Sequence, residues 1–466
     1  MSTRIEHDLI GDREIPSNAY YGVQTARAQE NFHITGVTLS GFPTFISALA
    51  KVKKACALAN YELELLPEHK KNAICEACDE IIAGEFHDQF VVDVIQGGAG
   101  TSTNMNANEV IANRALEILG HQKGEYKYLH PNNDVNLSQS TNDAYPTAFR
   151  IALFDKMYEL QYSMRILSNC FKKKSIEFND IIKMGRTQLQ DAVPMTLGQE
   201  FHTYVTMINE DIERLSEAQQ LIREINLGAT AIGTGINSHP DYTALVEKKL
   251  QDVTGRPFVT AKDLVEATQD TGAYVQISGV LKRVATKVSK ICNDLRLLSS
   301  GPRTGFNEIN LPAMQPGSSI MPGKVNPVIP EVVNQVAFQV IGADVTITMA
   351  SEGGQLQLNV FEPVIAYNLF NSINMMKNAF ETLANKCVCG ITANKERCLE
   401  LVLGSIGLVT ALNPYIGYEN STVVAKEALE SGRSVYDIVL EKKLLSKDEL
   451  DDIIKPENMI RPRTKK

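Results

Sequence analysis

The segment at residues 317–327 carries the side chains best suited to moving a proton and holding an anion. It reads Gly-Ser-Ser-Ile-Met-Pro-Gly-Lys-Val-Asn-Pro, so two hydroxyls, one ammonium and one amide lie close together. Pro322 and Pro327 exclude a regular helix through the segment and disfavour a strand. We therefore expect a loop with glycine hinges, and loops held by a rigid scaffold often carry catalytic side chains.

A second polar segment, residues 96–108, places three glycines ahead of a run of hydroxyl and amide side chains. We expect it to lead into a helix at residues 109–119. A glycine-rich turn at a helix N-terminus offers free N–H groups and a positive dipole end, which suits an anion. Helix capping explains the pattern about as well, with one of three hydroxyls as the cap. The three candidates are Thr101, Ser102 and Thr103.

Two further polar segments offer hydroxyl and amide groups. Residues 136–143 include Ser140, Thr141 and Asn142, directly ahead of an apolar stretch with helical periodicity. Capping could account for one of these side chains, but the density of the run favours contacts with a ligand. Residues 183–194 are expected to form another polar loop, which offers Arg186, Thr187 and Gln188.

Together these side chains suit a small dicarboxylate. Hydroxyls, amides and backbone N–H groups can hold one carboxylate, while Lys324 and an Asn hold the other. Removing a proton next to a carboxylate builds a dianionic, enolate-like intermediate, which prearranged donors and a lysine stabilise. A serine on the 317–327 loop can act as the base only if its alkoxide is stabilised. Closure of the loop would also exclude water.

The sequence lacks the motifs that are typical of several other kinds of active site. No histidine adjoins a nucleophile-elbow pattern, and no H-x-x-x-H or carboxylate cluster predicts a catalytic metal. The 317–327 loop is not a phosphate-binding P-loop, because five residues separate its glycines and Val325 follows the lysine. Residues 228–235 are glycine-rich but lack the G-x-G-x-x-G spacing of a dinucleotide site.

Long helices must position these segments. Apolar residues recur at 277, 281, 284, 288, 291, 295 and 298, an alternating four–three pattern. If this helix begins near Asp263, it has about 35 residues and spans roughly 50 Å. Similar patterns occupy residues 197–228, 333–350 and 364–384. Such helices need partners for their apolar faces, so they predict a mainly all-α fold with a bundle shared between subunits.

The composition is that of a soluble globular protein. The 466 residues are 44% hydrophobic and 22% charged, and the formal net charge is −9, which argues against nucleic acid or an acidic membrane as partner. The N-terminus lacks a signal-peptide pattern and no apolar run approaches 18 residues, so a cytoplasmic location is expected. In that compartment the eight cysteines are expected to be reduced.

Residues 19–27 are expected to form an extended arm, in which Arg27 either meets a carboxylate or lies on the surface.

The motifs resemble those of the fumarase/aspartase superfamily. Residues 317–327 look like its signature loop, and residues 100–106 and 140–142 resemble its other two active-site regions. The resemblance extends from Arg4 to about Pro456. Within the superfamily the chain is most similar to the aspartase branch. Gln188 stands where class II fumarases usually have His, and Val-Ile-Pro-Glu at 328–331 resembles the aspartase form. Residues 287–302 and 354–359 also look like aspartases.

The resemblance implies removal of ammonia from L-aspartate to give fumarate. Ser318 would be the base that takes the Cβ proton, through an aci-carboxylate intermediate. The α-carboxylate would be bound by Lys324, Asn326 and Thr187. The β-carboxylate would be bound by Thr101, Ser140, Thr141 and Ser319. Asn142 would hold the amino group, with Gln188 near it.

The resemblance also implies a homotetramer with a central core of long helices. Each active site would draw its three regions from three subunits. No cofactor is expected for the chemistry, although a divalent cation such as Mg²⁺ could act as an activator. The implied domains are residues 1–141, the helix bundle 142–397 and a small helical domain 398–466. The alternatives are a class II fumarate hydratase and a structural protein that reuses the lyase fold, as some lens crystallins do.

Overall fold

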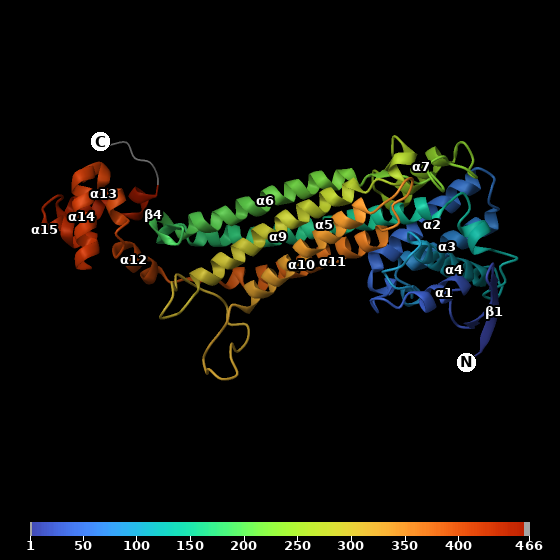
Figure 1. The fold of residues 1–466 in the computed structure, drawn as a ribbon, viewed down its shortest axis with the longest axis horizontal. Helices are drawn as coiled ribbons and strands as arrows, with labels where there is room; N and C mark the ends of the chain where they lie inside the picture. Colours follow the sequence, from blue (N-terminus) through green and yellow to red (C-terminus); the bar gives the residue numbers. More distant parts are fainter. Residues whose placement is uncertain (1, 461–466) are drawn as a thin grey trace. The chain divides into compact units, whose positions relative to one another are not determined.

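The computed structural model describes residues 2–460 and confirms a mainly α-helical fold. Long helices dominate it (Figure 1). The chain divides into two compact units. Unit 1 contains the residues up to Gln161 together with Arg214–Lys282 and Gln339–Met375. Unit 2 contains Tyr162–Glu213, Arg283–Phe338 and the residues from Met376 onward. The division into three domains stays a prediction, and the last six residues of its third domain lie outside the described part.

Each long helix contributes a segment to both units. In unit 1, Ser278 Oγ donates to Asp344 Oδ1 at 2.7 Å, which ties two of these helices together. In unit 2, the amide of Asn334 donates to Ser289 Oγ at 2.8 Å and joins the same two helices. Buried aliphatic side chains fill the space between the segments, as the four–three pattern predicts. The long helices are α5 (Thr141–Glu177), α6 (Leu197–Leu221), α9 (Gly272–Leu298), α10 (Val328–Glu352) and α11 (Glu362–Lys386).

The start of α9 differs from the sequence hypothesis. The helix begins at Gly272, not near Asp263, and has 27 residues. Asp263 instead caps a separate short helix, because its carboxylate accepts the N–H groups of Val265 and Glu266 at 2.9 and 3.1 Å. The short strands and helices before α9 are β5 (Glu224–Ile225), α7 (Tyr242–Thr254), β6 (Val259–Thr260) and α8 (Leu264–Ala267). Strands β5 and β6 pair in parallel.

The N-terminal part of unit 1 is a β-hairpin followed by packed helices. The prediction of an extended arm at residues 19–27 is wrong for its second half, because a helix begins at Val23. The buried carboxylate of Glu109 accepts the N–H groups of Gly22, Gln24 and Thr25 and so replaces a normal cap. Arg27 meets a carboxylate, with two bonds to Asp8 at 2.7 and 2.8 Å. The elements are β1 (Thr3–Asp8), β2 (Gly11–Pro16), α1 (Val23–Asn31), η1 (Leu39–Gly41), α2 (Pro43–Glu62), α3 (Glu68–Ile82), η2 (His87–Gln89), α4 (Thr101–Ile118) and η3 (Pro131–Val135).

Unit 2 ends in a small helical cluster with its own core. Buried residues from β3 and the last helices form this core, including Met184, Leu412 and Ile438. The expected polar loop at 183–194 is instead an antiparallel hairpin of two strands. The elements are β3 (Ile182–Thr187), β4 (Gln190–Thr196), β7 (Ile309–Asn310), η4 (Val388–Gly390), β8 (Thr392–Ala393), α12 (Lys395–Leu403), α13 (Leu408–Ile416), α14 (Tyr418–Ser431), α15 (Val435–Glu441), α16 (Lys447–Ile453) and α17 (Pro456–Met459).

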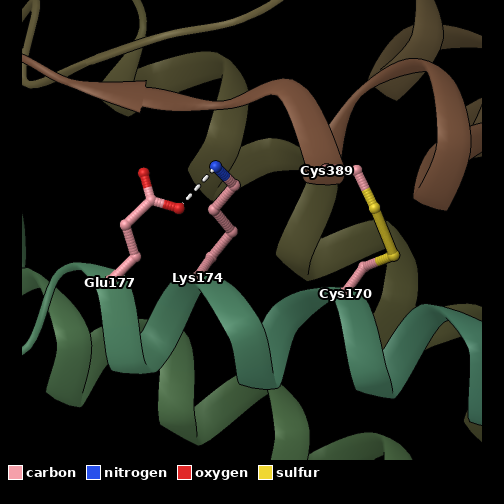
Figure 2. Close-up of a disulfide and its surroundings, with 4 residues drawn as sticks. All are labelled: Cys170, Lys174, Glu177 and Cys389. Carbon is pink, nitrogen blue, oxygen red and sulfur yellow. Dashed lines mark hydrogen bonds and ion pairs between the residues drawn. A yellow bond between two sulfur atoms is a disulfide. The ribbon is translucent and has the colours of Figure 1, made fainter.

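Two cysteines of unit 2 form a disulfide. Figure 2 shows Cys170 of α5 bonded to Cys389 of η4, one turn of α5 away from the ion pair between Lys174 and Glu177. The expectation that every cysteine is reduced is therefore wrong for this pair. The chain brings their Cα atoms to 5.5 Å, which is within the range that a disulfide can bridge, although 219 residues separate them in sequence.

Helix α10 exposes much of its apolar surface. By length and composition it could cross a membrane, and only 33% of its most apolar stretch is buried. Phe338, Ile341, Val345 and Met349 are all exposed and recur every three or four residues, so they form one face. A single helix of this kind is weak evidence for a membrane span, because the buried helix of an assembled soluble protein has the same composition.

Candidate active site

The signature loop at residues 317–327 is a compact turn closed on itself in unit 2. The N–H of Gly317 donates to the carbonyl of Lys324 at 2.7 Å, and the Asn326 amide donates to the carbonyl of Gly317 at 2.6 Å. A Cβ atom at position 317 would lie 2.6 Å from the Lys324 carbonyl oxygen, so this approach requires glycine. Gly323 has a φ of +82°, which also favours glycine.

Ser318 receives two hydrogen bonds from the backbone of its own loop. The N–H groups of Ile320 and Met321 donate to its Oγ at 3.1 and 3.0 Å. Two converging N–H groups stabilise negative charge on an oxygen, as they do in an oxyanion hole. Ser318 Oγ therefore lies at a position where negative charge would be stabilised.

A cavity of about 840 Å³ adjoins this loop in unit 2. Its lining consists of residues 321–327, residues 299–302, Asn307 and residues 309–312, together with Arg296. Lys324 lines the cavity and is exposed. Among the described residues its ammonium group has no hydrogen-bond or ion-pair partner. An uncommitted cation at the edge of a cavity is suited to binding a carboxylate.

The hairpin that carries Thr187 and Gln188 is anchored beneath its tip. Gln188 and Leu189 form the two-residue turn and have φ values of +54° and +62°. Arg186 donates to Glu308 at 2.7 Å, and Lys183 lies 3.1 Å from the other oxygen of the same buried carboxylate. This buried network fixes the hairpin, while its tip is exposed.

The first predicted region belongs to unit 1 and lies at the start of α4. The helix begins at Thr101 and not at 109, because Gly100 takes the N-cap position with a φ of +90°. No side chain caps the helix, so the capping explanation for Thr101 to Thr103 is wrong. The Thr101 hydroxyl donates to the Gly98 carbonyl at 2.7 Å and is exposed.

The turn before α4 accepts only glycine at position 100. Added to its left-handed backbone, a Cβ atom would lie 2.4 Å from the ring of Tyr145. We predict that Gly100→Ala lowers the melting temperature strongly, since the backbone strain costs about 1–2 kcal/mol and overpacking a further 1–3 kcal/mol. Gly84→Ala is the matched control, because Gly84 has a φ of +106° but open space around it. Equal losses in the two variants would contradict the packing argument.

The second predicted region begins α5 and is joined to the first. The Asn104 amide of α4 donates to Thr141 Oγ1 at 3.1 Å. The amide nitrogen of Asn142 donates to the carbonyl of Ala231 at 2.8 Å. The amide oxygen of Asn142 is consequently the atom directed away from that carbonyl. An oxygen acceptor is what an ammonium group requires.

Asp143 fastens this region to the glycine-rich segment at 228–231. It is fully buried and accepts the N–H groups of Ser140, Gly228 and Thr230 at 2.9, 3.2 and 2.9 Å. Burial raises the pKa of the Asp143 carboxyl to about 6, while these hydrogen bonds lower it. The glycine-rich segment thus has a scaffolding role, which its sequence did not reveal.

Comparison with known proteins identifies the family. A family profile described as "Lyase" matches residues 11–342, and one described as "Fumarase C C-terminus" matches residues 408–461. The chain belongs to the fumarase/aspartase superfamily.

Relatives that carry the name aspartate ammonia-lyase match almost the whole chain. The relative from Helicobacter pylori is 66% identical over 459 residues, covering 98% of both chains. That from Pseudomonas aeruginosa is 64% identical over 463 residues, covering 99% of this chain and 98% of the relative. The relative from Escherichia coli K12 is 58% identical over 460 residues, covering 98% of this chain and 96% of the relative.

Solved structures of superfamily members are also similar. A fumarate lyase:delta crystallin from Brucella melitensis bound to cobalt is 55% identical, with a TM-score of 0.97. The match covers 99% of this chain and 100% of that chain. A class II fumarase from Schistosoma mansoni is 35% identical, with a TM-score of 0.94 and the same coverage.

The superfamily site residues fall into two groups within this chain. Unit 1 holds one group, whose members are linked through Asn104 and Asp143. Both residues lie within the predicted segments, but the sequence analysis assigned them no role. Unit 2 holds the other group, on the hairpin and the signature loop. The roles of all ten residues stay predictions. The first group is Thr101, Ser140, Thr141 and Asn142, and the second is Thr187, Gln188, Ser318, Ser319, Lys324 and Asn326.

Sequence reasoning also missed Lys53. Its side chain is fully buried on α2 and donates to the amide oxygens of Asn104, Asn136 and Gln139. A signal was present, because Lys53 occupies an apolar position of a helix whose neighbours are Val52, Ala55 and Cys56. A lysine on the core face of a helix needs a polar partner.

Proposed function

We propose that the protein is an aspartate ammonia-lyase, which converts L-aspartate reversibly to fumarate and ammonia. The identity of 58–66% with relatives of that name supports the substrate. The single structural observation that carries the chemistry is the pair of N–H groups on Ser318 Oγ. They lower the cost of the alkoxide that must remove a weakly acidic C–H proton.

In the proposed reaction, the Ser318 alkoxide removes the proton from Cβ of L-aspartate. The electron pair of that C–H bond moves into the β-carboxylate and gives a dianionic aci-carboxylate. Ser140, Thr141 and Ser319 donate hydrogen bonds to its oxygens, and Thr101 joins them by turning its hydroxyl away from the Gly98 carbonyl. Lys324, Asn326 and Thr187 hold the α-carboxylate. The hydroxyl donors then stabilise charge on the β-carboxylate, where it accumulates.

Collapse of the intermediate forms the C=C bond and breaks the C–N bond. The nitrogen leaves with the bonding electron pair as ammonia, and the proton from Cβ ends on ammonium after passing through Ser318 and solvent. The Asn142 oxygen accepts from the amino group before it leaves. Because the charge is held by protein donors, we propose that no cofactor is required. Mg²⁺ as an activator stays a prediction, which adding or chelating Mg²⁺ in the activity assay tests.

The substrate is tested by following fumarate through its ultraviolet absorbance. We expect the purified protein to form fumarate from L-aspartate and at most a trace from L-malate. Fumarate from malate but not from aspartate would replace this proposal with a fumarate hydratase. No turnover of any dicarboxylate would favour a structural protein that reuses the fold, which is the alternative suggested by crystallin relatives.

We further propose a homotetramer whose active sites each draw on three subunits. The exposed apolar face of α10 supports this assembly, because an isolated chain would leave it in water. The central residues of that face are Phe338, Val345 and Met349, which are 63%, 58% and 68% exposed. The expected mass in solution is four times the 51.4 kDa of one chain.

Subunit complementation tests the sharing of sites. We expect Ser318→Ala and Thr141→Val tetramers to be weakly active alone, and mixed tetramers made by co-expression to recover activity. A mixed tetramer can assemble some sites from intact regions only, because the two defects lie on different chains. Co-expression of Ser318→Ala with an Asn326→Ala chain is the matched control, since both defects lie on the same loop. Mixed tetramers without recovered activity would contradict the shared site.

A further inference from the structure

Lys53 is a buried cation that the proposed chemistry does not use. It belongs to α2 in unit 1, beside α4 and the start of α5, and its side chain has no exposed surface. No carboxylate contacts its ammonium group among the described residues. Its three hydrogen bonds go to the amide oxygens of Asn104, Asn136 and Gln139, at 2.7, 2.9 and 2.8 Å.

These three bonds fix which way the Asn104 amide points. An ammonium group has three donors and no acceptor, so only the oxygen of each amide can face it. The NH₂ group of Asn104 must then point to the opposite side. There it donates to Thr141 Oγ1 and to Asn136 Oδ1, both at 3.1 Å. Asn104 is itself 1% exposed, so water cannot substitute for these partners.

The direction of the chain of hydrogen bonds decides what Thr141 can offer a substrate. Its oxygen already accepts from Asn104, and a hydroxyl has one hydrogen to donate. Among the described residues nothing accepts that hydrogen. It is consequently available to an acceptor-only group such as a carboxylate, whereas a reversed Asn104 amide would consume it.

We propose that Lys53 is a positioning residue that sets the donor-to-acceptor direction of these buried hydrogen bonds. Thr141 is then left to present its hydroxyl as a donor to the carboxylate of the substrate. The proposal rests on the role of Thr141 in the proposed function. Burial lowers the pKa of Lys53 to about 8, and Cys56, Asp143 and Cys78 raise it, so a charged ammonium persists at neutral pH.

A double-mutant cycle between Lys53 and Thr141 tests the proposal. Lys53→Met keeps an unbranched side chain, one atom shorter, and removes all three donors. We expect kcat/KM for L-aspartate to fall by about 10-fold to 100-fold, since the Asn104 amide is no longer held in the orientation that leaves the Thr141 hydrogen free. In a Thr141→Val background the same change should have little further effect, because the hydroxyl it acts through is gone. Lys54→Met is the matched control, an adjacent lysine whose partner is Asp79.

Asn104→Asp extends the test if Lys53→Met does not fold. The carboxylate keeps the shape of the amide and gains an ion pair with Lys53, but it can only accept. It should draw the Thr141 hydrogen inward and lower kcat/KM, and this loss should again shrink when position 141 is Val. Circular dichroism and solution mass confirm that each variant is folded.

The outcomes separate the two claims. Normal activity of Thr141→Val would overturn the site role of Thr141, and the proposal with it. An impaired Thr141→Val, with full and additive losses for Lys53→Met or Asn104→Asp, would overturn the positioning role alone and leave Lys53 as a structural lysine. Strong non-additivity in either pair supports the proposal.

Discussion

Ser318→Ala should abolish most of the turnover of L-aspartate while leaving the protein folded and assembled. A positioned general base contributes roughly 10²-fold to 10⁴-fold to a rate, and Ser318 is the hydroxyl of this loop that receives two backbone N–H groups. We therefore expect kcat to fall by about 10³-fold in the same fumarate assay. The two N–H groups of Ile320 and Met321 would lose their acceptor, but both are exposed to water, so the cost in stability is small.

Ser319→Ala is the matched control for this prediction. It removes a neighbouring hydroxyl from the same loop without touching the N–H pair. In its proposed role as a ligand of the β-carboxylate, Ser319 should affect binding more than the proton transfer. Near-normal kcat in Ser318→Ala, with an intact solution mass, would remove Ser318 as the base and with it the proposed mechanism.

Lys324→Ala should mainly weaken substrate binding. Losing a charge-assisted hydrogen bond to a carboxylate typically costs about 2–5 kcal/mol, so KM for L-aspartate should rise roughly 100-fold. Lys324→Arg should restore part of the binding, because the positive charge returns with a different geometry. Lys386→Ala, which removes an exposed lysine from the end of α11, should leave KM unchanged. An unchanged KM in Lys324→Ala would contradict the carboxylate role.

The features predictable from the sequence were those with strong local signals. The four–three spacing of apolar residues located α9, and two prolines with flanking glycines located the loop at 317–327. Residue types alone indicated a dicarboxylate, since hydroxyls and amides cluster with a single lysine. The predicted start of α9 was wrong because Asp263 caps the short helix α8, which ends before α9 begins at Gly272.

The features that could not be predicted depend on contacts between distant parts of the chain. Helix α1 begins at Val23 because the carboxylate of Glu109, 86 residues away, receives its first N–H groups. The hairpin of β3 and β4 is held by Glu308, far along the sequence. Lys53 reaches Asn104 only after α2 and α4 have packed. None of these partners is marked by local composition.

The most direct test of the central claim is the reverse reaction in heavy water. Fumarate and ammonium incubated with the protein in D₂O should give L-aspartate with one deuterium at Cβ, delivered by the serine that exchanges with solvent. Nuclear magnetic resonance distinguishes this product from malate and from undeuterated aspartate. Deuterated aspartate from the wild type, formed about 10³-fold more slowly by Ser318→Ala, is the predicted result. Malate as the product, or equal deuteration by both proteins, would contradict it.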